Sequence, residues 1–341
     1  MASDFLYPSN AELTQITQDL IPRLMANRRV FDPGVFPMTN ADAARVMWEQ
    51  ADNYWGLQQL RGLDGKPPVT QKVGVKRWAI EPGVYGEFEP ITETELTERR
   101  AYGSFAAPID VADLVMAASK RLLQRRLDRI ESIIWTLLVT GTFSVAGPAG
   151  ATIHKDTYTT QTYTASTPWA TAATSTPLAD FRAVQLKHRG HSVDFGARAL
   201  AFMSRVTFNQ MISNTNQSDL AGRRTACLGT FNNEAQVNQL MAGDDLPTLV
   251  VYDEGYLADA SGTFTPFLAD AKVVVIGKRA DGAPVGEYKM TRNANNPGLA
   301  PGPYTRVVDD EDALPRQIEV HDGHNGGPAL YYPSAIVSMS V

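Results

Sequence analysis

The strongest periodic pattern in the chain runs through residues 110–141, where apolar residues recur at steps of three and four. This spacing places them on one stripe and predicts a single amphipathic helix of about thirty residues. Asp110 stands where a helix N-cap is expected, and Gly141 stands where a helix commonly ends. At 1.5 Å per residue the helix would be roughly 45 Å long, well beyond the usual ~11–12 residues. The stripe consists of Val115, Ala118, Leu122, Leu123, Leu127, Ile130, Ile134, Leu137 and Leu138.

Residues 66–105 change to a strand-like pattern around a turn signal. Val73–Ile80 has strand propensity, Glu81-Pro82-Gly83 favours a turn, and Val84–Phe88 continues with charges between its apolar positions. The pattern predicts an extended loop over residues 66–105, built around a hairpin at Val73–Phe88. Because such a hairpin cannot bury much apolar surface on its own chain, a neighbouring subunit is expected to cover it.

The first 65 residues have too few apolar positions for an independent core. One helical stretch precedes Pro33, and Asn40 can cap a second short helix. We predict an arm over residues 1–65 that lies on another surface, with an ordinary N-terminal subdomain as the alternative. The first helical stretch carries its apolar residues at Leu13, Ile16, Leu20 and Leu24.

The rest of the chain divides into three parts. Residues 106–176 join the long helix to a β insert rich in Thr, Ser and Gly, in which Trp169 is expected to pack as an anchor. Residues 177–280 alternate helices and strands without strict regularity, which favours an α/β unit with a mixed sheet. Residues 281–341 are rich in Gly, Pro and Asn, which favours a loop, and they end in a β-type segment that must pair with another strand. We expect that segment to return to the unit at 106–176.

Composition and charge narrow the range of functions. The 341 residues are 43% hydrophobic and 20% charged, which is ordinary for a folded protein. The net charge of −6 argues against a protein whose main role is to grip nucleic acid, although enclosing DNA without adhering to it stays compatible. Cys227 is the only cysteine, so it forms neither an intramolecular disulfide nor a zinc site of its own. No signal-peptide pattern and no membrane-length apolar stretch is present, so synthesis in a cytosol is expected.

No linear motif in the chain carries recognisable chemistry. The nearest approach to a phosphate-binding loop, Gly62–Lys66, is followed by Pro67 where Ser or Thr is required. Turn residues interrupt both histidine pairs that have a metal-ligand spacing, which are His188 with His191 and His321 with His324. Catalytic residues, cofactors and bound metals are therefore not predicted, although an active site need not leave a linear motif.

The order of these elements is arm, projecting hairpin, long helix, β insert, α/β unit and closing strand. This order resembles the Hong Kong 97 phage capsid fold, an α+β fold, and within it the lambda-like major head protein (protein E) family. Short stretches are similar to parts of that family, namely Pro82-Gly83 followed by Leu96, Arg99 and Arg100, the helix end Leu137–Thr142, Val250-Val251-Tyr252 with Gly255-Tyr256, Phe267-Leu268, Val274–Gly277, and Pro333–Val341. The resemblance implies an N-terminal arm (1–65), an extended loop (66–105), a peripheral domain (106–176) with its spine helix, and an axial domain (177–280).

The resemblance also implies a function and a set of partners. Members of this family are major capsid proteins of tailed bacteriophages, which assemble into pentamers and hexamers of an icosahedral head around double-stranded DNA. Separate scaffolding and portal proteins are expected partners, a decoration protein is left open, and no membrane is involved. The expected location is the virion, after assembly in the host bacterial cytoplasm. The residues expected at assembly interfaces are Trp78, Tyr85, Phe88, Arg99, Arg100 and Trp169.

Two alternatives to a phage shell stay open. An encapsulin-type nanocompartment has the same type of fold but encloses enzyme cargo. An α/β hydrolase-like enzyme would use residues 177–280 and would need a deep polar pocket there. The basic residues of the long helix also have two interpretations, since they either form a solvated face or contact packaged DNA or a neighbouring subunit. These residues are Lys120, Arg121, Arg125 and Arg129.

Overall fold

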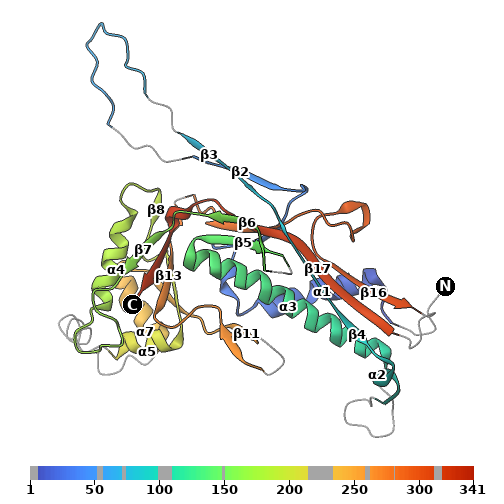
Figure 1. Ribbon diagram of the computed structural model, residues 1–341. Coiled ribbons are helices and arrows are strands. Elements are labelled where there is room, and N and C mark those ends of the chain that lie inside the picture. The colour runs from blue at the N-terminus through green and yellow to red at the C-terminus, as the bar shows by residue number, and fades with distance from the viewer. Residues whose placement is uncertain are drawn as a thin grey trace.

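One long helix, α3, supports two β-sheets that lie toward its opposite ends, and a two-stranded hairpin projects away from this body (Figure 1). The chain is represented by a computed structural model. It describes residues 7–51, 57–70, 74–98, 110–147, 150–213, 233–257, 262–279, 281–310 and 317–341.

The helix α3 spans Val111–Thr140, as its apolar stripe predicts. The Asp110 carboxylate accepts a hydrogen bond from the Ala112 N–H at 3.1 Å, which satisfies one of the free donors at the helix start. Gly141 adopts a φ of 69° and donates its N–H to the Leu137 carbonyl at 2.8 Å, a left-handed geometry that ends many helices. The predicted helix and both of its end residues are confirmed.

Two hydrophobic cores share α3 between them. Its first half enters a small core with the helix α1 (Asn10–Met25) and the sheet above it, through Leu114, Val115, Ala118 and Leu122. Its second half enters the large core, where the Trp135 ring lies 5.4 Å from Phe202 and 5.0 Å from Tyr252, centroid to centroid. Each large apolar side chain buried in this way contributes about 1.5–3 kcal/mol. The position of α3 therefore fixes the position of one core relative to the other.

The sheet over the first half of α3 is built around the 14-residue strand β17. Its five strands are β1 (Met38–Asn40), β4 (Gly83–Ile91), β15 (Gly286–Met290), β16 (Tyr304–Asp310) and β17 (Gln317–Leu330). β17 runs antiparallel to β4, β15 and β16, while β1 joins β15 in parallel.

The sequence pattern of β17 predicts a loop, because it contains three glycines and a proline, so this strand is a correction. The glycines are what allow the strands to approach. A Cβ atom at Gly323 would lie 2.6 Å from the Tyr85 carbonyl oxygen, and one at Gly326 would lie 2.7 Å from the Lys289 carbonyl oxygen. A residue type that usually weakens strands is required here by the close packing of neighbouring backbones.

The prediction of a hairpin at Val73–Phe88 is wrong, because the two halves of that segment pair with other strands and not with each other. β3 (Val75–Ile80) pairs antiparallel with β2 (Val46–Ala51), and β4 pairs with β17 instead. The Glu81-Pro82 turn therefore carries the chain from the projecting hairpin into the sheet. The real hairpin is β2–β3, and its described outer segment, 57–70, straddles the boundary predicted between arm and extended loop. The prediction of a second short helix capped by Asn40 is also wrong, since β1 ends at Asn40 and the residues that follow lead into β2.

The second sheet has the strand order β10-β9-β13-β18-β7 and mixes parallel and antiparallel pairs, as predicted for 177–280. The closing strand β18 returns to the unit at 106–176 by pairing with β7, and on its other side it pairs with β13 of the α/β unit, so it joins the two units within the second sheet. Three of its five side chains are apolar and four of the five residues are buried, which suits a place between two strands. The strands are β7 (Gln161–Thr164), β9 (Leu200–Met203), β10 (Thr248–Val251), β13 (Lys272–Ile276) and β18 (Ile336–Ser340).

Helices and shorter elements accompany this second sheet in the described residues. The helices are α4 (Pro177–Gln185), α5 (Arg205–Ile212) and α7 (Glu234–Gly243). The paired short strands are β5 (Thr142–Ala146) with β6 (Thr152–Thr157), β8 (Val193–Asp194) with β14 (Lys278–Arg279), and β11 (Gly255–Leu257) with β12 (Phe264–Pro266). The short helices are η1 (Arg29–Phe31), α2 (Glu93–Glu98), η2 (Leu186–His188), η4 (Pro297–Leu299) and η5 (Pro333–Ala335).

Two buried arginines tie α3 to its surroundings. Arg126 of α3 donates to the Asp322 carboxylate of β17 at 2.6 Å, and both side chains are at most 5% exposed. Arg28, from the segment after α1, donates to Asp128 and, at 2.8 Å, to the fully buried carboxylate of Glu131. Burial raises the pKa of Glu131 to about 7, even though Arg28 opposes that shift.

Replacing Arg126 with Met is expected to lower the free energy of unfolding by about 3–5 kcal/mol, because it leaves the Asp322 carboxylate buried without its partner. The double variant Arg126→Met/Asp322→Asn should recover much of that loss, since no uncompensated charge then remains. Urea unfolding of the soluble subunit measures both values. A double variant no more stable than Arg126→Met would contradict this account of the pair.

The raised pKa of Glu131 makes stability depend on pH. The folded state holds the Glu131 proton up to about pH 7, whereas the unfolded chain releases it near the ordinary value of 4.5. The free energy of unfolding should therefore fall as the pH rises from about 4.5 to 7, by up to about 3 kcal/mol from this group. The Glu131→Gln variant should show a flatter dependence over that window in urea unfolding, and an unchanged slope would refute the assignment.

Candidate interaction surfaces

The outer part of the β2–β3 hairpin exposes apolar side chains that no described part of the subunit covers. Every residue of the described segment 57–70 is exposed. Figure 1 shows this segment far from both sheets, beyond the paired part of the hairpin. Soluble monomers seldom expose apolar residues so fully and so close together. The exposed fractions are 98% at Leu57, 99% at Leu60, 98% at Leu63 and 94% at Val69.

An aromatic cluster holds the root of the hairpin against the body. Trp78 lies directly opposite Trp48 in the β2–β3 pair, with ring centroids 6.4 Å apart, and its ring lies 4.7 Å from that of Tyr158. The Trp48 indole N–H donates to the Leu330 carbonyl at 3.2 Å. Trp78, a predicted interface anchor, is thus half-buried against its own chain and positions the hairpin from within.

The other predicted anchors differ in how they lie. β4 alternates its side chains between two faces, so Tyr85 points toward α3 while Phe88 lies on the opposite face. Phe88 is 54% exposed and stacks on His321, with ring centroids 5.2 Å apart. Arg99 and Arg100 lie outside the described residues.

The prediction that Trp169 lies at an assembly interface is corrected, because its side chain is fully buried within the subunit. Its indole N–H donates to the Asp180 carboxylate at 2.8 Å, and its ring packs 5.6 Å from that of Phe181. A tryptophan whose polar atom already has a buried partner is a core residue, and this one cannot serve as a contact for another subunit.

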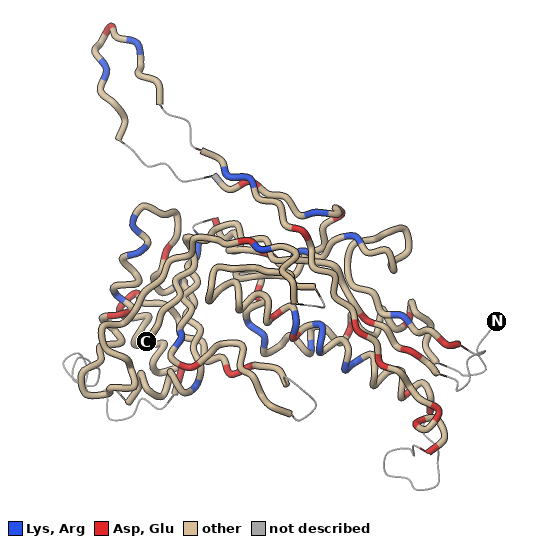
Figure 2. Tube along the Cα trace, in the orientation of Figure 1, with Lys and Arg blue, Asp and Glu red and all other residues tan. Residues whose placement is uncertain are grey.

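The basic residues of α3 are mostly neutralised within the subunit. Arg121 is paired with Glu89, and Arg125 donates to both oxygens of Glu87, at 2.5 and 3.0 Å. Among the described residues, neither Lys120 nor Arg129 has an acidic partner. Figure 2 shows basic positions along α3 and acidic positions on the chain that runs beside it. The solvated-face interpretation therefore describes this row better than a strip of free positive charge.

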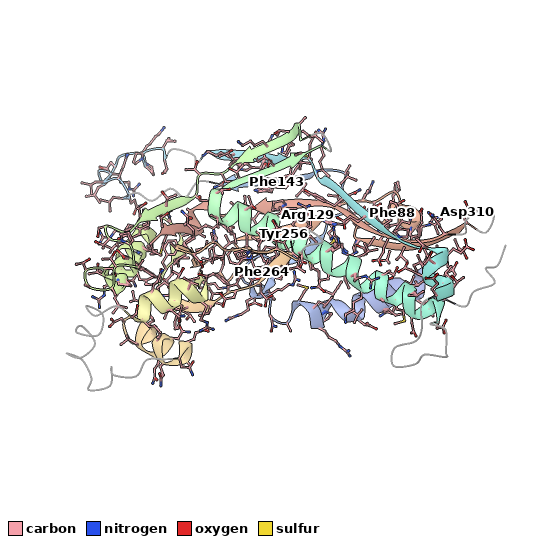
Figure 3. The ribbon with its side chains drawn as sticks, turned by 60° about the horizontal axis from the view of Figure 1, so that its bottom comes forward. Phe88, Arg129, Phe143, Tyr256, Phe264 and Asp310 are labelled. Atoms are coloured by element: carbon pink, nitrogen blue, oxygen red, sulfur yellow. The ribbon has the colours of Figure 1, made fainter. Side chains whose placement is uncertain are left out.

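A cleft of about 400 Å³ opens between α3, β4, β17 and the β11–β12 hairpin. Arg129 and Ser132 line it from α3, Tyr85 lines it from β4, and Tyr256 and Leu257 line it from β11. Figure 3 shows Arg129 on the long helix near Tyr256 and Phe264 of the hairpin. The cleft thus combines a cationic side chain with aromatic and aliphatic walls.

The wall of this cleft includes a buried histidine, His324 of β17. Its Nε2 and the Tyr288 hydroxyl lie 3.0 Å apart, while its Nδ1 is buried without a hydrogen-bond partner. Burial and the nearby Arg126 and Arg129 lower the pKa of His324 to about 3, so the ring is neutral. Sequence reasoning could not have found this wall, since β4, α3 and β17 meet there from three distant parts of the chain.

A second cleft, of about 480 Å³, lies on the opposite face of β4 beside Phe88, His321 and Asn293. The described residues contain no group of three or more His, Cys, Asp and Glu side chains placed to hold a metal ion. Nor does any described helix have the length and apolar character needed to cross a membrane. The notable features of the described surface are therefore the exposed hairpin and these two clefts.

Three solved structures resemble this chain over most of its length. The putative capsid protein of a prophage of E. coli CFT073 has a TM-score of 0.62 at 14% identity, covering 98% of this chain and 99% of its own. A phage-related protein of Bordetella bronchiseptica RB50 has a TM-score of 0.53 at 9% identity, covering 98% of both chains. The capsid protein of cyanophage Pam1 has a TM-score of 0.51 at 13% identity, covering 90% of this chain and 88% of its own. The phage capsid fold expected from the order of elements is confirmed.

A curated relative and a family model complete the comparison. The tryptophan synthase beta chain of Allorhizobium ampelinum is 34% identical over 98 residues, which are 28% of this chain. The match spans only 23% of that enzyme, so it assigns neither family nor activity. The family model described as phage major capsid protein E matches residues 9–339. Since that match covers almost every element described above, the chain belongs to the phage major capsid protein E family.

Proposed function

We propose that this chain is the shell subunit of a tailed bacteriophage, assembling into pentamers and hexamers of an icosahedral head around double-stranded DNA. Membership of the phage major capsid protein E family supports the shell role. The observation that carries the assembly mechanism is the β2–β3 hairpin, whose described tip is wholly exposed and rich in leucine. Its apolar surface needs cover, and a neighbouring copy of the same subunit supplies it.

A closed shell needs several different contacts made by one kind of subunit. Projecting segments suit this task because they bury area on neighbours, and permanent interfaces of this kind bury on the order of 2,000–5,000 Å² in total. Phe88 and Val84 add an exposed apolar patch on the outer face of β4, at 54% and 79% exposure. Phe88 is therefore the predicted anchor that stays best placed for a contact between subunits.

The same proposal covers the contents and partners of the shell. The chain carries a net charge of −6, and three of the five basic residues of α3 are paired with acidic side chains, which suits a wall that encloses DNA without sequence-specific binding. Scaffolding and portal proteins are proposed as separate partners, the virion as the location, and the host cytoplasm as the site of assembly. The subunit acts as a structural protein and not as an enzyme.

Replacing residues 57–70 with a short Gly-Ser linker should give a soluble subunit that forms no closed shells. The reason is that the exposed leucines are lost while both cores of the subunit are untouched. Negative-stain electron microscopy and sedimentation of the purified protein measure the outcome.

A matched control removes exposed apolar residues elsewhere, with Leu186→Ser and Leu299→Ser, which are 50% and 54% exposed in the parent chain. This control should form shells normally. Closed shells of normal size from the linker variant would reject the role assigned to the hairpin.

A further inference from the structure

The cleft between α3, β4, β17 and β11 holds three hydrogen-bond donors that the described part of the subunit leaves unused. They are the Arg129 guanidinium, the Ser132 hydroxyl and the Tyr85 hydroxyl. Arg129 and Ser132 are three residues apart, so they share one face of the helix. Donors converging on one space, one of them a permanent cation, form a receptor for an anionic group.

Of the charged side chains that line the cleft, Arg129 alone has no ion-pair partner among the described residues. Arg125 is paired with Glu87, Arg126 with Asp322, and Asp128 with Arg28 from outside the cleft. One positive charge therefore remains beside the unpartnered Nδ1 of His324 in the cleft wall. The site fits a single negative charge, while Glu87 and Asp128 at its margin oppose a larger anionic surface.

The apolar walls of the cleft favour a ligand that carries an apolar group next to its anionic group. Tyr256 and Leu257 form one wall, and Leu257 is 61% exposed, so it has apolar area left to bury. Leu122 of α3 also lines the cleft. A volume of about 400 Å³ lies in the usual range of sites that enclose a small group, roughly 300–1,000 Å³.

The described chain presents such a pair of side chains at the tip of its own hairpin. Gly65 donates its N–H to the Gly62 carbonyl at 3.1 Å, which closes a tight turn with Leu63 and Asp64 at its two central positions. Leu63 is 98% exposed, and Asp64 has no ion-pair partner in the described part of the chain. One apolar and one acidic side chain thus stand next to each other at the point farthest from the body.

We infer that the Leu63–Asp64 turn of one subunit enters the α3–β4–β11 cleft of a second copy, where Asp64 pairs with Arg129 and Leu63 packs between Tyr256 and Leu257. The inference rests on the proposed function and adds the receptor to it. A second copy fits better than the same chain, because Figure 1 shows the hairpin directed away from its own α3. It also fits better than DNA, because a duplex would bring many phosphates against Glu87 and Asp128.

Charge reversal tests the pair directly. Asp64→Arg alone and Arg129→Glu alone should each raise the subunit concentration needed for half-maximal shell assembly about tenfold or more, as for loss of a charge-assisted contact. The double variant should return that concentration to near the wild-type value. The matched control is Lys120→Glu, which reverses the other unpaired cation of α3 and does not line the cleft, and which should assemble normally.

Each result of this experiment decides the inference. Singles that assemble normally, or a double variant that stays as defective as the singles, overturns it. If the singles assemble normally while replacement of 57–70 still prevents shells, only the receptor is wrong and the hairpin keeps its role. If the variant in which 57–70 is replaced also forms shells, both the receptor and the assembly role proposed for the hairpin are wrong.

A second experiment does not depend on reversed charges being tolerated. In a Cys227→Ser background, Leu63→Cys with Leu257→Cys should give disulfide-linked oligomers on a non-reducing denaturing gel after oxidation of assembled shells. Leu63→Cys with Leu299→Cys, a pair whose second position lies in the exposed short helix η4, should stay monomeric. A ladder from the control pair alone, or from neither pair, rejects the proposed contact.

Discussion

The structure depends on two guanidinium groups buried against α3. Arg126 joins the helix to β17, and Arg28 joins it to the segment that follows α1. Buried ion pairs add little net stability compared with apolar packing, but a displaced partner is costly. We interpret these contacts as devices that fix register. A one-turn slip of α3 against β17 would leave Arg126 and Asp322 buried and apart, so one arrangement of helix and sheet is strongly preferred.

That register decides what β4 can do, because β4 is held between β17 and the arginines of α3. Successive side chains of a strand point to opposite faces. Tyr85 and Glu87 therefore line the cleft above α3, while Val84 and Phe88 lie on the other face. A single nine-residue strand thus contributes to two separate surfaces, and neither would exist if β4 slipped by one residue.

The sequence predicts the parts of this fold that depend on local physics. The long helix with Asp110 and Gly141 at its ends, and the buried strands near Val274, follow from periodicity and capping. Pairing over long distances escapes such reasoning. β2 and β3 are far apart in the sequence, and the glycine pattern of β17 looks like a loop until its neighbouring backbones are known. The α3 cleft is likewise invisible, because Arg129 and His324 meet only after β17 has paired with β4.

The place of β18 has a consequence for the order in which the subunit forms. β18 lies between β13 and β7, so the second sheet stays in two pieces until residues 336–340 have left the ribosome. Its pairing with β7 joins segments that are very far apart in the chain, the kind of contact that forms late and slowly. A nascent chain therefore lacks the complete second sheet until its β18 residues have been made.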